Sequence, residues 1–263
     1  MAASLIPGRM KKVVRLVEDL KRLLFPRSCI FCGKALSAES EGLCDSCRAS
    51  FLSERAILCP KCGRKAAFCT CPVMHLEREV FPKVSFAVSR FYNTEHNSDV
   101  GKMTRELILR GKQESRQEIA ELLAKDLTIR VEGILYWNGE DRRDWIVTYA
   151  PRNPENLLKY GFDHGKIIAE ALAKQMGCVM LPTLFRHSGN MQKDMEVGMR
   201  YTNAECGLSL RKNSVAEGGK YILVDDVLTT GATMSAAAKL LYLSGAEKVL
   251  PAAVARAVRI GKK

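Results

Sequence analysis

Two adjacent acidic residues follow a run of apolar residues near the end of the 263-residue chain. The stretch YILVDDVLTTGATMSAAAKLL, residues 221–241, passes from an apolar segment into Asp225 and Asp226, and then into a turn rich in threonine. An apolar strand that ends in two carboxylates places them at the carboxyl edge of a parallel sheet, where α/β proteins bind ligands. The helix predicted to follow presents free N–H groups and a positive dipole end, which attract phosphate. These residues predict a site for a sugar phosphate.

The turn supplies groups suited to this ligand. Gly231 allows the backbone to come close to a phosphate, and three threonines offer hydroxyl donors. The acidic pair would accept hydrogen bonds from sugar hydroxyls while the turn holds a 5-phosphate. The residues predicted to form the site are Asp225, Asp226, Thr229, Thr230, Gly231, Ala232 and Thr233.

Eight of the ten cysteines lie between positions 29 and 71, in four close pairs. Zinc prefers four soft ligands in a tetrahedron, and a CxxC turn supplies two thiolates. The spacing predicts two zinc ions, and it leaves open a single zinc ion or redox-active thiols. Four thiolates per ion leave no position for water, so the zinc is expected to be structural.

Sequential pairing of the cysteines is expected because each loop is then short and closes at little entropic cost. A crossed arrangement of the first pair with the third stays open. Cys178 and Cys206 stand apart and are expected to be small buried hydrophobic residues. The predicted ligand sets are Cys29, Cys32, Cys44 and Cys47 for one ion, and Cys59, Cys62, Cys69 and Cys71 for the other.

Beyond the cysteines, apolar runs alternate with helical patterns, which predicts an α/β parallel sheet with helices on both faces. Residues 188–203 are polar and are expected to form a mobile loop. Its Lys193 and Arg200 would close over the site as a lid, or simply stay exposed. Strands are expected at 84–92, 145–150, 181–187, 221–224 and 248–258, and helices at 98–110, 115–131, 163–176 and 233–244, with Gly111 between the first two helices.

The chain divides by composition into three parts: a basic amphipathic helix at 1–27, a cysteine-rich domain at 28–75 and the α/β domain at 83–263. The formal net charge is +12, and residues 1–97 hold 16 Lys and Arg against 9 Asp and Glu. Such a surplus suits a polyanion, either nucleic acid or a phosphorylated small molecule, although a solvated cationic surface is the alternative. Four aromatic residues would either stack on bases or pack inside the cysteine-rich domain: Phe25, Phe31, Phe51 and Phe68.

No apolar run reaches the ~18 residues that a membrane-spanning helix needs. The apolar stretch near the N-terminus is interrupted by charged residues, unlike a signal peptide. A cytoplasmic location is therefore expected.

The stretch VDDVLTTGAT resembles the phosphoribosyl pyrophosphate (PRPP) motif of type I phosphoribosyltransferases, in which an acidic pair precedes a T-G-x-T loop. Five further stretches extend the resemblance to the ComF family over nearly the whole chain: LLFPRSCIFCG, GLCDSCRASF, CPKCG, PKVSFAVSRFYNTEHNSDVGKMTRELILRGKQE and YAPRNPENLLKYGFDHGKIIAEALAKQMG. This resemblance implies a zinc ribbon ahead of a type I phosphoribosyltransferase-like domain. It also implies an association with DNA uptake in natural competence.

The resemblance implies roles for several residues. Asp225 and Asp226 would be the catalytic pair, gripping the ribose hydroxyls and assisting Mg²⁺ bound with PRPP. Residues 229–233 would hold the 5-phosphate, and Arg152 would bring charge to the pyrophosphate. Purine-salvage relatives usually carry an aspartate as general base where this chain has Thr229, which disfavours a purine acceptor handled in that way.

Two segments depart from the family pattern near the expected pyrophosphate loop. Residues 160–164 are Tyr-Gly-Phe-Asp-His where the family usually has Arg-Gly-Phe-Asn-Gln, and residues 147–151 are Val-Thr-Tyr-Ala-Pro where it has Val-Pro-Val-Pro. A weaker affinity for PRPP is therefore expected. His164 and His187 are candidate proton carriers or ordinary surface and capping histidines.

Two classes of function fit these observations. The first is an enzyme that moves phosphoribose to an acceptor that the sequence does not identify. The second is a non-catalytic module that senses PRPP, while its ribbon and basic helix bind single-stranded DNA or a competence helicase-like partner.

Overall fold

The computed structural model describes residues 27–37, 40–73, 86–95, 98–187, 202–203 and 207–259. The chain forms two compact units, Met1–Ser50 and Phe51–Lys263. Several predictions lie outside the described residues: the basic helix at 1–27 except its last residue, Phe25, Cys206, and the lid residues Lys193 and Arg200. No helix in the described ranges combines the length and apolarity that crossing a membrane requires.

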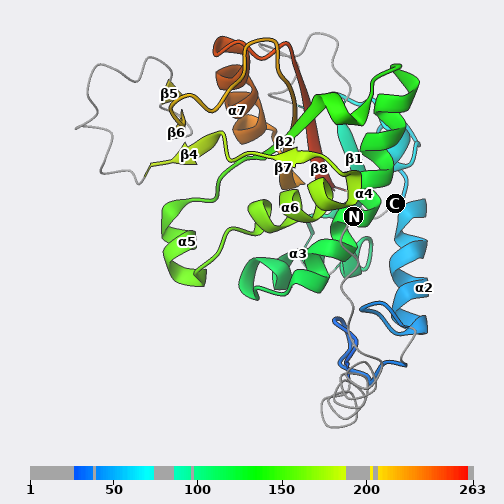
Figure 1. Cartoon of the computed structure of the whole chain (residues 1–263). Helices are drawn as coiled ribbons and strands as arrows, with labels where there is room; N and C mark the ends of the chain where they lie inside the picture. The colour runs from blue at the N-terminus through cyan, green and yellow to red at the C-terminus, as the bar shows by residue number, and fades with distance from the viewer. Residues whose placement is uncertain are drawn as a thin grey trace, which may run out of the picture. The chain divides into compact units, whose positions relative to one another are not determined.

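A five-stranded parallel sheet forms the centre of the larger unit (Figure 1). Its strands stand in the order β1-β8-β7-β2-β3, with parallel pairing throughout. The bounds are β1 Ala87–Asn93, β2 Trp145–Tyr149, β3 Val179–Met180, β7 Lys220–Leu228 and β8 Lys248–Val258. The predicted α/β parallel sheet is confirmed.

Helices cover both faces of this sheet, as expected (Figure 1). On one face α4 (Gln117–Trp137) packs against α6 (His164–Met176), and both contact the strands. On the other face α7 (Ala232–Leu243) shares a core with Tyr221 and Leu223 of β7. Residues alternate between the two faces of a strand, so the equally buried Ile222 and Val224 point toward the opposite face. Both faces of β7 are therefore buried, which explains its continuous apolar run.

Strand β7 is longer than the sequence predicted. It was expected to end at Val224, before the acidic pair, but it continues to Leu228 because β8 keeps pairing with it, through Asp225 to Ala253 and Leu228 to Arg256. Pairing with β2 on the other side stops at Tyr149 and Val224. The acidic pair therefore lies on a strand that is held on one edge and open on the other.

Two helices differ from the predicted bounds. Helix α3 (Lys102–Gln113) includes Gly111, which was expected to separate two helices, and α4 extends six residues past its predicted end at 131. Helix α5 (Pro154–Tyr160) was not predicted, although its start carried a clear signal. Asn153 caps it by accepting a hydrogen bond from the backbone of Glu155, and Pro154 occupies the first turn.

A second, three-stranded antiparallel sheet has the order β4-β6-β5. Its strands are β4 Leu184–Arg186, β5 Thr202–Asn203 and β6 Leu208–Leu210. The expectation of a loop over 188–203 was thus wrong for its last two residues, which pair with β6. Cys178 is half-buried rather than buried, with its thiol directed at the carbonyl of Arg142, 3.2 Å away.

The cysteines gather in the two groups that sequential pairing predicted, each with all four sulfur atoms within 4.8 Å of one another. The first pair of each group uses the same turn. Gly33 N donates to Cys29 O and Gly63 N donates to Cys59 O, both at 2.9 Å. Gly33 and Gly63 have φ of 76° and 67°, a conformation that favours glycine. Four thiols at this spacing suit tetrahedral zinc.

The second cysteine group is part of the core of the larger unit. Cys59, Cys69 and Val73 pack in one apolar cluster with Val88 and Phe91 of β1. Arg256 of β8 ties the segment to the sheet, since its guanidinium donates to Cys71 O at 2.8 Å and to Pro72 O at 2.6 Å. Loss of this group would therefore disturb the sheet itself.

We expect Cys59→Ser to lower the thermal midpoint of the larger unit by several degrees, because it removes a thiol from a group built into that core. Cys29→Ser is the matched control, since it removes a thiol from the group in the smaller unit. Both tryptophans of the chain, Trp137 and Trp145, lie in the larger unit, so tryptophan fluorescence follows that unit. Equal midpoints for the two variants would contradict the structural role assigned to the second group.

Candidate functional site

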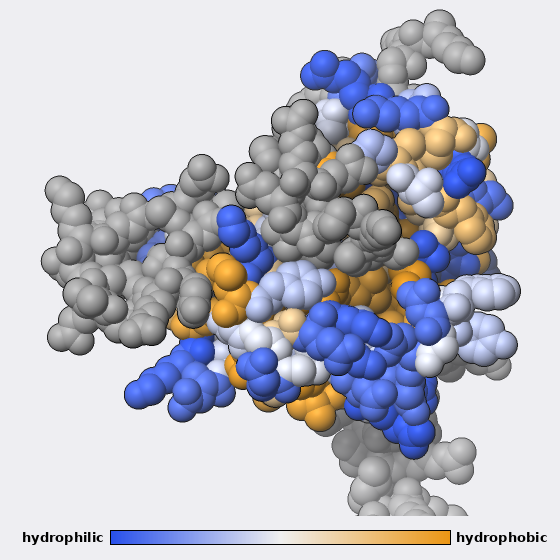
Figure 2. All heavy atoms as spheres, turned by 90° about the horizontal axis from the view of Figure 1, so that it is seen from above, coloured by the Kyte–Doolittle hydropathy of each residue, from blue (hydrophilic) through white to orange (hydrophobic). Residues whose placement is uncertain are grey.

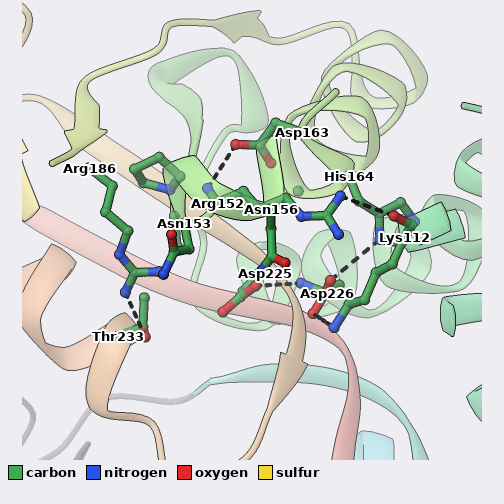
Figure 3. Close-up of a pocket in the computed structure, with 13 residues that line it drawn as sticks. Lys112, Arg152, Asn153, Asn156, Asp163, His164, Arg186, Asp225, Asp226 and Thr233 are labelled. Carbon is green, nitrogen blue, oxygen red and sulfur yellow. Dashed lines mark hydrogen bonds and ion pairs between the residues drawn. The ribbon is translucent and has the colours of Figure 1, made fainter. Parts of the chain in front are cut away.

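A cavity of about 210 Å³ opens at the carboxyl edge of the sheet, beside the unpaired edge of β7 (Figure 3). The loop after β2 forms one wall, and the acidic pair lies opposite it. Residues from α3, α5, α6, β4 and α7 complete the lining. The residues that line the cavity are Lys112, Ala150, Pro151, Arg152, Asn153, Asn156, Asp163, His164, Gly165, Arg186, Asp225, Asp226 and Thr233.

Asp226 is held by two partners. Its Oδ1 lies 3.0 Å from Lys112 Nζ, and its Oδ2 lies 3.3 Å from His164 Nδ1 (Figure 3). Burial opposes ionisation of Asp226, but the hydrogen bond from His164 and the charge of Lys112 outweigh it and lower the pKa of this carboxyl. An ionised carboxylate only accepts, so His164 donates from Nδ1. Its Nε2 is buried and has no hydrogen-bond partner among the described residues.

Asp225 has the opposite character. Its Oδ1 accepts a hydrogen bond of 2.8 Å from the backbone N–H of Asp226. Burial, followed by the neighbouring charge of Asp226, raises the pKa of Asp225 to about 8. Without a ligand this carboxyl therefore holds a proton near neutral pH. A cation or a set of hydroxyl donors placed beside it would favour the carboxylate.

The position of Lys112 depends on how α3 begins. The helix starts after Gly101, which has no side chain to cap it. Glu54 acts as the cap instead, accepting 2.8 Å hydrogen bonds from the backbone N–H groups of Met103 and Thr104, and one of 2.6 Å from the Thr104 hydroxyl. Because Lys112 lies in the last turn of this helix, the contact at its start fixes where the ammonium group meets Asp226.

His164 packs closely against α3. A Cβ atom added at Gly111 would lie 2.3 Å from His164 Nε2, so only glycine leaves room for the ring. This contact explains why Gly111 occurs in the interior of a helix, where it costs roughly 1 kcal/mol relative to alanine.

The loop after β2 is held in place by its own hydrogen bonds. Ala150 N donates to Val224 O at 2.9 Å, and Arg152 N donates to Asp163 Oδ2 at 2.8 Å. The Arg152 side chain donates to the carbonyls of Lys112, at 3.0 Å, and Phe162, at 3.3 Å. Arg152 lines the cavity, and it also ties three segments together.

The predicted phosphate turn lies between β7 and α7. Gly231 has φ of 82° and precedes the first residue of α7, so a side chain here would strain the backbone. Thr229 and Thr230 are exposed, and Thr230 Oγ1 accepts a hydrogen bond of 3.4 Å from Ala232 N. Of residues 229–233, Thr233 is the one that lines the cavity.

The structure adds residues that the sequence did not assign. Arg186 enters the cavity from β4 and approaches Thr233, with 3.5 Å between Nη2 and Oγ1 (Figure 3). Asn153, Asn156 and Lys112 also line it. His187, a candidate proton carrier, instead meets Ser209 Oγ at 2.7 Å and does not line the cavity. The sequence carried no signal for Arg186, whose importance comes from the place of β4 beside α7.

Comparison with protein families matches two parts of the chain. Residues 20–77 match a double zinc ribbon domain, and residues 163–261 match a phosphoribosyl transferase domain. The first match covers both cysteine groups, which are therefore structural zinc sites. The second covers Asp163, His164, Arg186 and the acidic pair.

Known relatives match the chain over different lengths. The DNA utilization protein YhgH of Salmonella typhimurium is 26% identical over 227 residues, which is 86% of this chain and 96% of that protein. YhgH of Escherichia coli K12 is 23% identical over the same shares. The adenine phosphoribosyltransferase of Idiomarina loihiensis is 34% identical over 100 residues, or 37% of this chain and 54% of that enzyme.

Gly111→Ala should destabilise the protein by about 1–3 kcal/mol, because the new methyl group must displace the His164 ring. Gly133→Ala in α4 is the matched control, since a Cβ there meets no atom within 4 Å. It should stabilise the protein by up to about 1 kcal/mol through helix propensity. Denaturant unfolding followed by tryptophan fluorescence tests both values. Equal effects of the two substitutions would rule out the close contact between α3 and His164.

Proposed function

We propose that this chain, which is a ComF-like protein with a double zinc ribbon ahead of a phosphoribosyltransferase domain, binds PRPP with Mg²⁺ and transfers its phosphoribosyl group. The observation that supports this proposal is the acidic pair on the open edge of β7, where Lys112 and His164 contact Asp226 and burial raises the pKa of Asp225 to about 8. The match to transferase sequences favours transfer over a role limited to sensing PRPP.

Each part of PRPP has a counterpart in the cavity or in the turn beside it. Asp225 and Asp226 would accept hydrogen bonds from the ribose hydroxyls. The 5-phosphate would lie on the backbone N–H groups of residues 229–233, at the positive end of α7. The pyrophosphate would lie along the loop after β2, near Arg152 and Arg186.

The donor set also fits Mg²⁺, which prefers carboxylate and phosphate oxygens. Bound Mg²⁺ would neutralise charge on the pyrophosphate as it leaves. The protein's own residues hold the reactants: Lys112 and His164 fix Asp226, and Asp226 orients the ribose. Thr229 takes no proton near neutral pH, so the acid or base for the acceptor lies elsewhere.

We further propose that the protein contacts single-stranded DNA, since its long relatives are named DNA utilization proteins. A second cavity of the larger unit, of about 470 Å³, combines basic and aromatic side chains. Phe68 and Trp137 line it and are 66% and 85% exposed, beside Arg55, Lys65 and Arg130. Aromatic and basic groups together suit stacked bases and a phosphate backbone.

Other aromatic candidates are less suited to stacking. Phe51 is buried under the guanidinium of Arg90, 3.5 Å from its ring centroid, and Phe31 is half-buried. Figure 2 shows one face of the molecule, on which apolar patches lie between hydrophilic ones.

The proposal also includes a helicase-like partner and a cytoplasmic location, where PRPP and DNA are available.

The double variant Asp225→Asn, Asp226→Asn should lose measurable PRPP binding in calorimetry with MgCl₂ while keeping its fold. The matched control is Asp141→Asn, Asp144→Asn, which removes two exposed carboxylates next to the start of β2, at the opposite edge of the sheet. Unchanged PRPP affinity in the first variant would refute the site.

Because Asp225 must lose its proton, the affinity of the wild-type protein for PRPP should also rise between about pH 7 and about pH 9, and Asp225→Asn should remove that rise.

Phe68→Ala and Trp137→Ala should each weaken binding of an oligothymidine by about 1–3 kcal/mol, the usual value of one stacked base. Tyr136→Ala is the control, because Tyr136 is 78% exposed next to Trp137 but does not line the cavity. Fluorescence anisotropy at several salt concentrations measures these affinities. If Tyr136→Ala costs as much as Trp137→Ala, or if neither cavity variant weakens binding, DNA does not bind here.

A further inference from the structure

A larger cavity, of about 520 Å³, lies behind the loop that follows β2. Four residues of the loop and its surroundings line both this cavity and the acidic one: Pro151, Arg152, Asp163 and Arg186. The volume is in the range of small-molecule sites. Two cavities that share a wall can hold two reactants side by side.

We propose that this 520 Å³ cavity, called the acceptor cavity below, binds the phosphoribosyl acceptor, and that the acceptor is a planar aromatic compound carrying a carboxylate. The acceptor role rests on the proposed function, because it needs PRPP in the first cavity. The chemical class of the ligand follows from the lining alone.

Flat apolar side chains line much of the cavity. Tyr149, Phe162 and Phe185 contribute aromatic rings, and Leu157 and Ile167 add apolar surface. These residues come from β2, α5, α6, β4 and the segment between α5 and α6. Aromatic rings prefer to pack against other flat rings, in stacked or edge-on contact. The lining therefore suits a planar ring.

The charges at this cavity favour an anion. Lys166 faces Glu170 at 3.6 Å, and Asp163 is occupied by the backbone N–H groups of Arg152 and Lys166. Arg211 has no carboxylate partner among the described residues, and its guanidinium lies 5.9 Å from the Phe185 ring centroid. Its positive charge therefore lies next to an aromatic wall, and a guanidinium binds a carboxylate with two parallel hydrogen bonds.

Tyr149 supplies a neutral donor in the same place. The residue is only 6% exposed, yet it lines the cavity, and its hydroxyl has no hydrogen-bond partner among the described residues. Burial raises the pKa of Tyr149, so the hydroxyl keeps its proton and can donate to a carboxylate or carbonyl oxygen. An anionic acceptor would satisfy both Arg211 and Tyr149.

A nitrogen atom of the acceptor, in the ring or attached to it, forms a bond to C1 of the ribose while the bond from C1 to the pyrophosphate oxygen breaks. Pyrophosphate leaves with that electron pair. An acceptor that attacks through an N–H group passes this proton to the pyrophosphate, whereas a pyridine nitrogen carries no proton and becomes a pyridinium. This route uses no protein base at Thr229, in agreement with the residue found there.

Calorimetry with a panel of benzoate, 2-aminobenzoate, pyridine-2-carboxylate and pyridine-2,3-dicarboxylate tests the inference on the full chain, with and without PRPP and MgCl₂. At least one member should bind, and the matching carboxamide should bind at least tenfold more weakly. Arg211→Gln should weaken the aromatic acid at least tenfold and leave PRPP affinity unchanged. Tyr149→Phe, which keeps the ring, should weaken it severalfold.

Arg143→Gln is the control for loss of one exposed positive charge, since Arg143 precedes β2 at the opposite edge of the sheet. The inference is wrong if no member of the panel binds, or if Arg211→Gln and Arg143→Gln bind the acid equally well. If PRPP binds and the acids do not, only the assignment of the acceptor cavity is wrong. If the acids bind through Arg211 but PRPP does not bind, the proposed function and the acceptor role are both rejected.

Discussion

The site depends on one feature of the sheet: β7 runs four residues further than its neighbour β2. Pairing with β2 ends at Val224, while β8 still pairs with Asp225, Val227 and Leu228. The acidic pair is therefore fixed by backbone hydrogen bonds on one side and open to a ligand on the other. A shorter β7 would leave the carboxylates on a flexible loop, and a longer β2 would cover them.

A chain of buried polar contacts links this open edge to the segment that follows the first cysteine group. Arg90 of β1 is fully buried, pairs with Asp126 of α4 and donates to Phe51 O at 2.6 Å. Three residues further on, Glu54 caps α3, whose last turn brings Lys112 to Asp226. Desolvation offsets much of the attraction within a buried charge pair, so removing Arg90 or Asp126 alone would cost more than the pair contributes to stability. The second zinc site extends the same support, because Arg256 binds the backbone of Cys71 and Pro72.

The sequence predicted what local chemistry determines. The order of the main strands and helices, the two cysteine groups and the acidic pair all followed from periodicity, spacing and motif. The sequence-based prediction failed where contacts between residues far apart in the chain determine the structure. Gly111 was taken for a helix break because nothing nearby in the chain shows that His164 packs on it. Lys112 and Arg186 carried no motif, and they enter the site only because α3 and β4 lie next to the carboxyl edge. The end of β7 was misplaced because aspartates are rare within strands, and pairing with β8 overrides that preference.

The charges of the cavity explain why a metal ion belongs to the proposed function. Its lining holds three basic side chains, Lys112, Arg152 and Arg186, against three acidic ones, Asp163, Asp225 and Asp226. The basic groups are largely engaged, since Lys112 pairs with Asp226 and Arg152 binds backbone carbonyls. A diphosphate that entered alone would meet Asp225 and Asp226 without enough positive charge to offset it. A divalent cation bound with the phosphates would offset that repulsion and would favour loss of the proton of Asp225. The folded state binds the proton of Asp225 more tightly than the unfolded chain does, so the contribution of this carboxyl to stability falls as pH rises from about 4 to about 8. Binding of the cation with PRPP would offset this loss, which couples the stability of the sheet edge to occupancy of the site.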